Sequence, residues 1–279
     1  MRAALVQLTS ADDPAESAAR LRPLLARAEA DLVCTPEVTN MVAPRALLLE
    51  RAVAEDDDPV LALLRDEAAR RGRWIAVGSL ALRDGDALVN RSLLLDPQGA
   101  IAARYDKLHM FDVDLGGPES YRESATFRPG ARAVVAPTPL ATLGLTICYD
   151  LRFPRLHRAL AQAGAHVLLA PAAFTVPTGE AHWHVLLRAR AIETGCFVLA
   201  AAQTGTHAHA RRTWGHSLAV SPWGAVLADA GTAPGVTHVD LDLALVEDAR
   251  GRVPSLANGR DFEEPGDPPV PRTPSIRAT

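Results

Sequence analysis

Three residues able to perform covalent acyl chemistry each follow an apolar or β-prone run: Glu37, Lys107 and Cys148. Cys148 ends an apolar run over 143–147 and precedes a helix-patterned stretch. A cysteine at such a junction is expected on a sharp turn with its sulfur exposed, where the positive end of the helix dipole favours the reactive thiolate. Most free cysteines are instead small buried hydrophobes. Cys148 alone therefore leaves both interpretations open.

Glu37 and Lys107 favour the reactive interpretation. Sites in α/β proteins gather at the carboxyl ends of strands, so we expect the three side chains to meet there. A glutamate can take the thiol proton and later deliver it to a leaving amine, and a lysine can stabilise a developing oxyanion. The set suits attack on a carbonyl or nitrile carbon through a thioester or thioimidate.

Glu37 and Lys107 each have a simpler interpretation as well. Glu37 could be a carboxylate favoured by a helix N-terminus. Lys107 could be a solvated loop lysine, but it is the chain's only lysine, while arginine supplies the other strong cations. That contrast favours a specific role for a compact ammonium whose pKa can be tuned.

Bulk composition narrows the possible partners. The chain has 279 residues and a net charge of −4, with no basic block, so nucleic acid is not an expected partner. Its three cysteines are far apart, which argues against a disulfide framework and favours a reducing cytoplasm. No run approaches the roughly 20 apolar residues of a membrane span, and residues 1–8 indicate a strand rather than a signal peptide.

Strand and helix patterns alternate, which predicts one α/β domain with a mixed sheet over residues 1–262. A proline-rich tail, 263–279, is expected to be extended. The polar segments 107–130 and 203–213 are predicted loops, and loops as long as the first are usually functional. Strands are expected at 3–8, 31–34, 74–82, 88–95, 100–105, 131–136, 140–147, 166–170, 196–202, 216–221, 225–229 and 236–241, and helices at 14–30, 44–54, 59–71, 151–163, 179–194 and 243–250.

The three motif blocks, in this order, resemble the nitrilase superfamily of carbon–nitrogen hydrolases over about residues 1–262. Nearest in appearance is the amidase branch that contains omega-amidases and deaminated glutathione amidases. The supporting segments are 107–115, 121–124, 147–154, 182–193 and 214–217. True nitrilases usually carry Cys-Trp-Glu at the nucleophile, whereas this chain has Cys148-Tyr149-Asp150, which favours an amide over a nitrile.

The resemblance implies a four-layer α-β-β-α sandwich and a division of labour in the site. Cys148 would be the nucleophile and Glu37 the general base. Lys107 and the backbone N–H of Tyr149 would form the oxyanion hole. A second glutamate would hold the lysine, and Glu123 fits this role better than its rival, Glu119, in the same loop.

The reaction implied is hydrolysis of a small linear carboxamide to a carboxylate and ammonia, without metal or organic cofactor. Substrates would carry a second carboxylate, such as an alpha-keto acid amide or deaminated glutathione. The family typically dimerises through helices that correspond here to 151–163 and 179–194, so a homodimer or higher homo-oligomer is expected.

Other polar residues are weaker candidates for substrate binding. Arg152 could bind a substrate carboxylate, or form a salt bridge with Asp150 or Glu193. Thr175 could line the pocket and His182 could contact the substrate.

The histidine pairs 182/184 and 207/209 have metal-like spacing, but no ligand set accompanies them in sequence. His216 is expected in the core. The alternative functions are N-carbamoyl amide hydrolysis, non-enzymatic binding on this fold, and a metallohydrolase.

Overall fold

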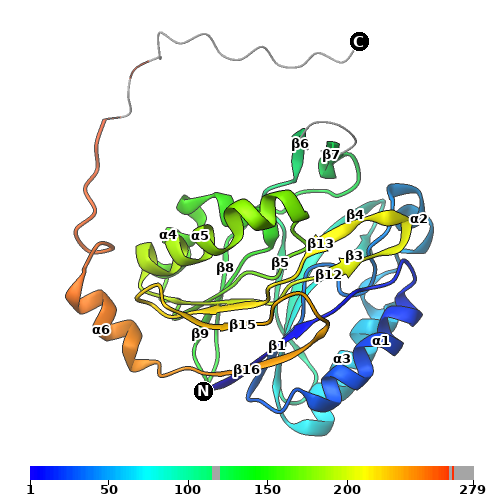
Figure 1. Ribbon diagram of the computed structural model, residues 1–279, viewed down its shortest axis with the longest axis horizontal. Coiled ribbons are helices and arrows are strands. Elements are labelled where there is room, and N and C mark those ends of the chain that lie inside the picture. The colour runs from blue at the N-terminus through cyan, green and yellow to red at the C-terminus, as the bar shows by residue number, and fades with distance from the viewer. Residues whose placement is uncertain (115–119, 264–265, 267–279) are drawn as a thin grey trace.

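Two six-stranded sheets stack face to face, and helices cover their outer faces (Figure 1). The structure is a computed structural model that describes residues 1–114, 120–263 and 266. Glu119 and nearly all of the proline-rich tail lie outside the described residues. The four layers confirm the fold class expected from the sequence.

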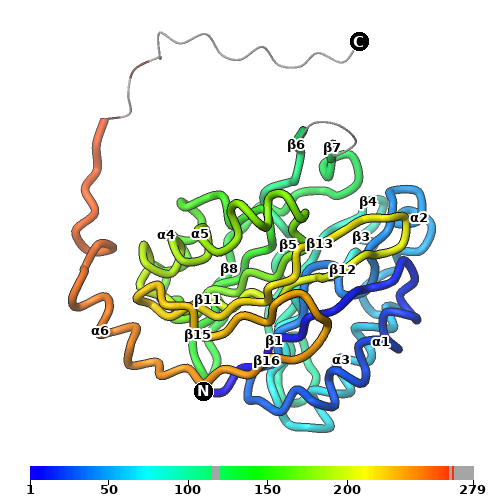
Figure 2. The backbone as a smooth tube through the Cα atoms, in the orientation of Figure 1, coloured from blue at the N-terminus to red at the C-terminus, as the bar shows by residue number. Residues whose placement is uncertain are grey.

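The first sheet has the strand order β16-β1-β2-β3-β4-β5. Strands β1, β2 and β3 are parallel, and β16, β4 and β5 add antiparallel edges. Strand β16 pairs with β1, which joins two distant parts of the chain (Figure 2). The bounds are β1 Arg2–Gln7, β2 Leu32–Cys34, β3 Trp74–Asp84, β4 Ala87–Leu95, β5 Ile101–Asp106 and β16 Gly235–Asp240.

The second sheet has the order β15-β14-β11-β10-β9-β8. Its centre, β9, β10 and β11, is parallel, and the remaining pairings are antiparallel. Both sheets are mixed, as the alternating pattern predicted. The bounds are β8 Val134–Pro137, β9 Thr142–Leu145, β10 Val167–Leu169, β11 Phe197–Ala200, β14 Leu218–Val220 and β15 Val226–Asp229.

Helices α1 and α3 pack on the first sheet, while α4 and α5 pack on the second (Figure 1). Helix α1 begins where the Asp13 side chain accepts hydrogen bonds from two first-turn N–H groups, and Asp58 caps α3 in the same way. The helices are α1 Pro14–Arg27, α2 Arg45–Arg51, α3 Pro59–Arg71, α4 Pro154–Gln162, α5 Val176–Thr194 and α6 Ala244–Arg252, and the 3-10 turns are η1 Glu55–Asp57, η2 Glu123–Ala125, η3 Cys148–Arg152 and η4 Ala208–Ala210.

Both predicted loops contain short hairpins. Strands β12 (Thr204–Thr206) and β13 (Arg212–Trp214) pair within the segment expected to be a loop, and β6 (Asp112–Asp114) pairs with β7 (Ser120–Arg122) in the other. These strands of three residues each are too short to show an apolar alternation in the sequence. Tertiary hydrogen bonds hold the first hairpin in place, from Thr204 N to Leu8 O and from Trp214 N to Phe174 O.

In the described part of the chain, no helix combines the length and apolar character needed to cross a membrane.

Candidate active site

Glu37, Lys107 and Cys148 follow β2, β5 and β9, so the strand ends of both sheets meet at one place. Together with Glu123 they line a cavity of about 400 Å³. The fold therefore brings these predicted residues together from distant segments, since Glu37 and Lys107 are 70 positions apart in sequence.

Lys107 lies between two carboxylates at the base of the cavity. Its Nζ is 2.9 Å from Glu37 Oε1 and 2.9 and 2.8 Å from the two oxygens of Glu123. Burial acts to lower the pKa of Lys107, but the charges of Glu123 and Glu37 outweigh it and raise the pKa above its usual range. Lys107 is therefore a permanent ammonium.

Glu37 is ionised for a related reason. Burial acts to raise the pKa of Glu37, but the charge of Lys107 and the hydrogen bond that Lys107 donates outweigh it, so the pKa lies below its usual value. Its Oε2 accepts a 2.9 Å hydrogen bond from the Ala173 N–H. The side chain is held as a carboxylate with both oxygens bound.

Cys148 differs from expectation in exposure and charge. Only 8% of the residue is accessible, so the expectation of an exposed sulfur was wrong. Burial, then the Glu37 carboxylate, raises the pKa of the thiol well above its usual value. The element that begins at Cys148, η3, is a 3-10 helix of five residues rather than an α-helix, and the dipole of so short an element does not offset these two effects. The raised pKa keeps the thiol in its neutral form.

The turn that presents Cys148 is strained and braced. Cys148 has φ +48°, a left-handed conformation that non-glycine residues rarely adopt. Asp150 holds the turn, because its Oδ2 accepts from Ile147 N at 2.8 Å and from the Tyr105 hydroxyl at 2.6 Å. Tyr105 belongs to β5, so this contact ties the cysteine turn to the strand that precedes Lys107.

Asn90 is a polar member of the site that the sequence analysis missed. Its Nδ2 donates to Glu37 Oε1 at 3.0 Å and to Glu123 Oε1 at 3.2 Å, linking the two carboxylates. The sequence does contain a signal for this residue, which is an asparagine within the apolar β4 strand. A buried polar group needs hydrogen-bond partners, so such an asparagine indicates polar neighbours inside the fold.

The three expected substrate-binding residues are placed differently. Arg152 and Thr175 line the cavity, whereas His182 is not among the lining residues and contacts Arg152 Nη2 at 3.2 Å. The alternative for Arg152, a salt bridge with Asp150 or Glu193, is not formed: Asp150 accepts from Ile147 N in the turn, and Glu193 pairs with Arg190. Tyr149 also lines the cavity, and as the second residue of η3 its N–H has no carbonyl partner within that turn.

Three more arginines, Arg45, Arg122 and Arg211, line the cavity. Arg211 also contributes to the lowered pKa of Glu37. Among residues 1–114 and 120–263, these three and Arg152 form no ion pair, unlike Arg91, which pairs with Asp106 at 2.6 Å. Their guanidinium charges surround a cavity whose acidic groups are already occupied by Lys107.

His182 and His184 contact different residues, because residues two positions apart on a helix point in different directions. His182 contacts Arg152, whereas His184 contacts Asp229 together with His216. The expectation that His216 packs in the core was wrong, because its side chain is 21% exposed and paired with Asp229. None of His184, His216 and Asp229 lines the cavity.

The chain is similar to known proteins in both sequence and structure. Residues 2–251 match the family model for carbon–nitrogen hydrolases. A deaminated glutathione amidase of Yersinia enterocolitica is 43% identical over 263 residues, 92% of each chain. The crystal structure of the Caenorhabditis elegans NitFhit protein superposes with a TM-score of 0.87 at 34% identity, covering 93% of this chain and 65% of that one.

A solved amidase adds a chemical parallel. A variant of the amidase from Nesterenkonia sp. AN1, at 31% identity and a TM-score of 0.76, covers 91% of this chain and 98% of its own, and it shows Michael addition of acrylamide at its active-site cysteine. These likenesses extend over almost all of the described chain. The chain belongs to the carbon–nitrogen hydrolase family.

Proposed function

We propose that this hydrolase cleaves a linear carboxamide with Cys148 as the nucleophile and Glu37 as its general base. The observation that supports this proposal most directly is geometric: Cys148 and Glu37 line one cavity, and Lys107 Nζ lies 2.9 Å from Glu37 Oε1. This arrangement agrees with a lowered pKa for Glu37, caused by the Lys107 charge against the effect of burial, and a raised pKa for the buried Cys148 thiol. A base that is ionised beside a protonated nucleophile is ready to accept its proton.

The first half of the reaction forms an acyl-enzyme. Glu37 takes the thiol proton while the sulfur bonds to the amide carbon, and the carbonyl electron pair moves to oxygen. The Tyr149 N–H and Lys107 face that oxygen. Protonated Glu37 then gives its proton to the amide nitrogen, and the carbon–nitrogen bond breaks. The amine departs, and the acyl group stays on Cys148 as a thioester.

The second half hydrolyses the thioester. Glu37 removes a proton from water, and the resulting hydroxide attacks the carbonyl carbon. The carbon–sulfur bond breaks, and Glu37 returns its proton to the sulfur. The product leaves as a carboxylic acid, which gives its proton to the solvent and becomes a carboxylate. The two half-reactions together consume the amide and one water molecule.

Glu123 holds Lys107 and so limits how the ammonium can serve the oxyanion. The ammonium has three N–H groups and three carboxylate oxygens within 2.9 Å. An N–H becomes available to the substrate only if the two oxygens of Glu123 share one donor. We therefore assign Glu123 the role of orienting Lys107.

We propose that the substrate carries carboxylates, with deaminated glutathione as the leading candidate. The name of the 43% identical relative supports this substrate, and so do the four cavity arginines without acidic partners in the described chain. Arg152 lies over the rings of Tyr149 and Phe174, with its guanidinium carbon 5.9 and 5.6 Å from their centroids. Stacking of this kind orients a guanidinium for bidentate carboxylate binding.

Product analysis tests this proposal. Hydrolysis of a keto acid amide frees ammonia, whereas in deaminated glutathione the scissile nitrogen belongs to the cysteinyl residue, so an amine is freed instead. We expect turnover of one of these compounds by the unsubstituted protein and none by Cys148→Ala with an unchanged circular dichroism spectrum. Turnover by Cys148→Ala would refute the nucleophile, and carbon dioxide release from a carbamoyl compound would refute the amide substrate.

We also propose a homodimer in the cytoplasm. Large apolar side chains are exposed on α5 and around β15: Val185 at 67%, Ile192 at 54%, Trp223 at 58%, and Val226 and Leu227 at 43% each. Apolar surface of this kind marks protein interfaces, and three free cysteines suit a reducing compartment. Light scattering after size-exclusion chromatography tests the dimer, and Val185→Glu should yield a monomer while Val253→Glu, at an exposed site beyond α6, should not.

A further inference from the structure

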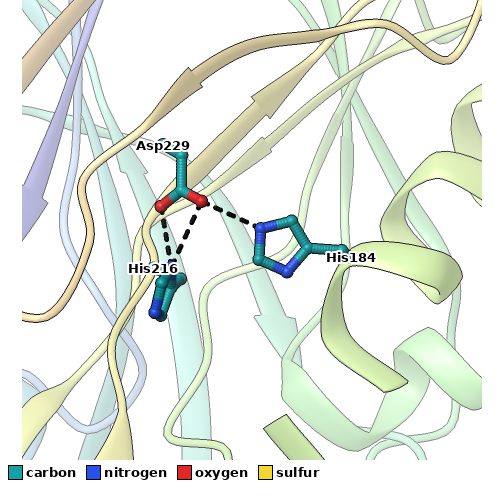
Figure 3. A group of neighbouring side chains, drawn as sticks. All are labelled: His184, His216 and Asp229. Atoms are coloured by element: carbon teal, nitrogen blue, oxygen red, sulfur yellow. Dashed lines mark hydrogen bonds and ion pairs between the residues drawn. The ribbon is translucent and has the colours of Figure 1, made fainter. Parts of the chain in front are cut away.

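Three metal-ligating side chains converge on the outer side of the second sheet. His184 comes from α5, His216 from the segment before β14, and Asp229 is the last residue of β15. His184 Nε2 is 2.9 Å from Asp229 Oδ2, and His216 Nδ1 is 2.9 Å from Asp229 Oδ1. One ligand atom from each residue lies within 4.8 Å of the other two. Figure 3 shows both rings directed at the carboxylate.

The surrounding structure holds two of these side chains in place. His216 has φ +54°, its N–H donates to Gly231 O at 2.6 Å, and its ring stacks on Trp214 with centroids 4.7 Å apart. The Gly231 N–H donates to Asp229 Oδ1 at 2.9 Å. A strained backbone kept by such contacts indicates that the direction of the His216 ring is specified rather than incidental.

We propose that His184, His216 and Asp229 bind one divalent transition-metal ion of the Zn²⁺ type. Two imidazole nitrogens and one carboxylate oxygen are a common donor set for Zn²⁺, with bonds of roughly 2.0–2.2 Å. Tetrahedral ligands at such distances lie about 3.4 Å apart, so small rotations of side chains now 2.9 Å apart would admit an ion.

Solvent can complete the coordination. The side chains of His184, His216 and Asp229 are 36%, 21% and 32% exposed, which leaves room for a water molecule as fourth ligand. Each imidazole would present to the ion the lone pair of the nitrogen that faces Asp229 and keep its N–H on the other ring nitrogen.

The ion would be structural rather than catalytic. Its ligands lie outside the cavity, but they connect α5 to β14 and β15. The same helix carries Thr178 on the cavity wall and starts after Thr175. A ligand that binds only the folded chain stabilises it, so bound metal should raise the melting temperature and leave the chemical step intact.

A Co²⁺ and Zn²⁺ titration tests the site. The protein, freed of any histidine tag, would carry Cys148→Ala so that the site thiol cannot bind metal. We expect one Co²⁺ per chain, with visible absorption lacking a thiolate charge-transfer band, and competition by Zn²⁺. His184→Gln and Asp229→Asn should each weaken binding at least about 10-fold, the lower end of the loss seen for an outer-shell partner.

His209→Gln is the matched control. His209 Nε2 lies 3.1 Å from Asp12 Oδ2, a similar pair for which the described chain supplies no third ligand, so this variant should bind metal like its parent. Because a variant can misfold, the melting temperature of the unsubstituted chain provides a second test: Zn²⁺ should raise it and Mg²⁺ should not. No stoichiometric binding, equal binding by His184→Gln, or no Zn²⁺ effect on melting would show that the three residues form only a hydrogen-bonded clamp.

Discussion

Both carboxylate oxygens of Glu123 lie within 2.9 Å of Lys107 Nζ, and the lysine side chain is only 2% exposed. A buried ammonium is tolerated here because carboxylates neutralise it, and each carboxylate in turn depends on the ammonium. The site behaves as one electrostatic unit, so removing one charge should affect stability as well as catalysis.

Lys107→Met tests this interdependence. The variant leaves Glu37 and Glu123 buried without their cation, so we expect a loss of about 3–5 kcal/mol in unfolding free energy together with loss of turnover. Urea unfolding and amide hydrolysis measure the two effects. The double variant Lys107→Met/Glu123→Met removes one uncompensated charge and should recover part of the stability but no turnover. A fully stable single variant would contradict the coupling.

Glu37→Gln should separate thiol ionisation from catalysis. Among the influences on the pKa of Cys148, burial is the largest and the Glu37 charge comes next, and both raise it. Removing the charge lowers that pKa, so alkylation of Cys148 by iodoacetamide should begin at lower pH than in the unsubstituted protein. Turnover should nevertheless fall at least about 100-fold, because the general base is gone.

Cys34 provides the internal control for this alkylation experiment. Burial raises the pKa of Cys34 to about 12, so it should stay unmodified across the same range. Modification would be assigned by mass spectrometry. An alkylation profile that is unchanged or displaced to higher pH in Glu37→Gln would contradict the assigned protonation states.

Gly78→Ala tests how the backbone places Glu37. A Cβ at this position would lie 2.0 Å from Thr35 O and 2.4 Å from Pro36 O, so the segment that leads into Glu37 would have to move. Overpacking of this kind costs roughly 1–3 kcal/mol, and turnover should fall more than the stability loss accounts for. Gly235→Ala is the matched control, since nothing lies within 4 Å of its added Cβ. Equal behaviour of the two variants would argue against a positioning role for Gly78.

Acid should destabilise the protein through His157. Burial lowers the pKa of this imidazole to about 4, whereas the unfolded chain has the ordinary value of about 6.5. Between these values the unfolded state binds more protons, so stability falls with decreasing pH, by up to about 1.4 kcal/mol per unit for this group.

His157→Gln should flatten that slope. Urea midpoints at pH 7, 6 and 5 measure it for both proteins. His207, whose pKa burial also lowers to about 4, keeps part of the slope in the variant. An identical pH dependence in the two proteins would mean that His157 does not stay neutral in the folded state.

The sequence by itself predicted most of the principal elements, a mixed α/β class, and Glu37, Lys107 and Cys148 as candidate site residues. These are local signals: apolar runs such as 143–147, chargeable residues directly after them, and capping residues such as Asp13 and Asp58. Each is encoded within a few positions of the chain, so short-range physical chemistry suffices to interpret it.

Only the tertiary structure decided which groups of the site are charged and which further residues belong to it. Glu37 and Lys107 are 70 residues apart, and the burial that keeps Cys148 neutral comes from both sheets. Asn90 joins the site because its amide, on β4, donates hydrogen bonds to both Glu37 and Glu123. Likewise His184 meets Asp229 from 45 residues away. Burial and electrostatic fields depend on everything that packs around a group, so no local pattern could specify them.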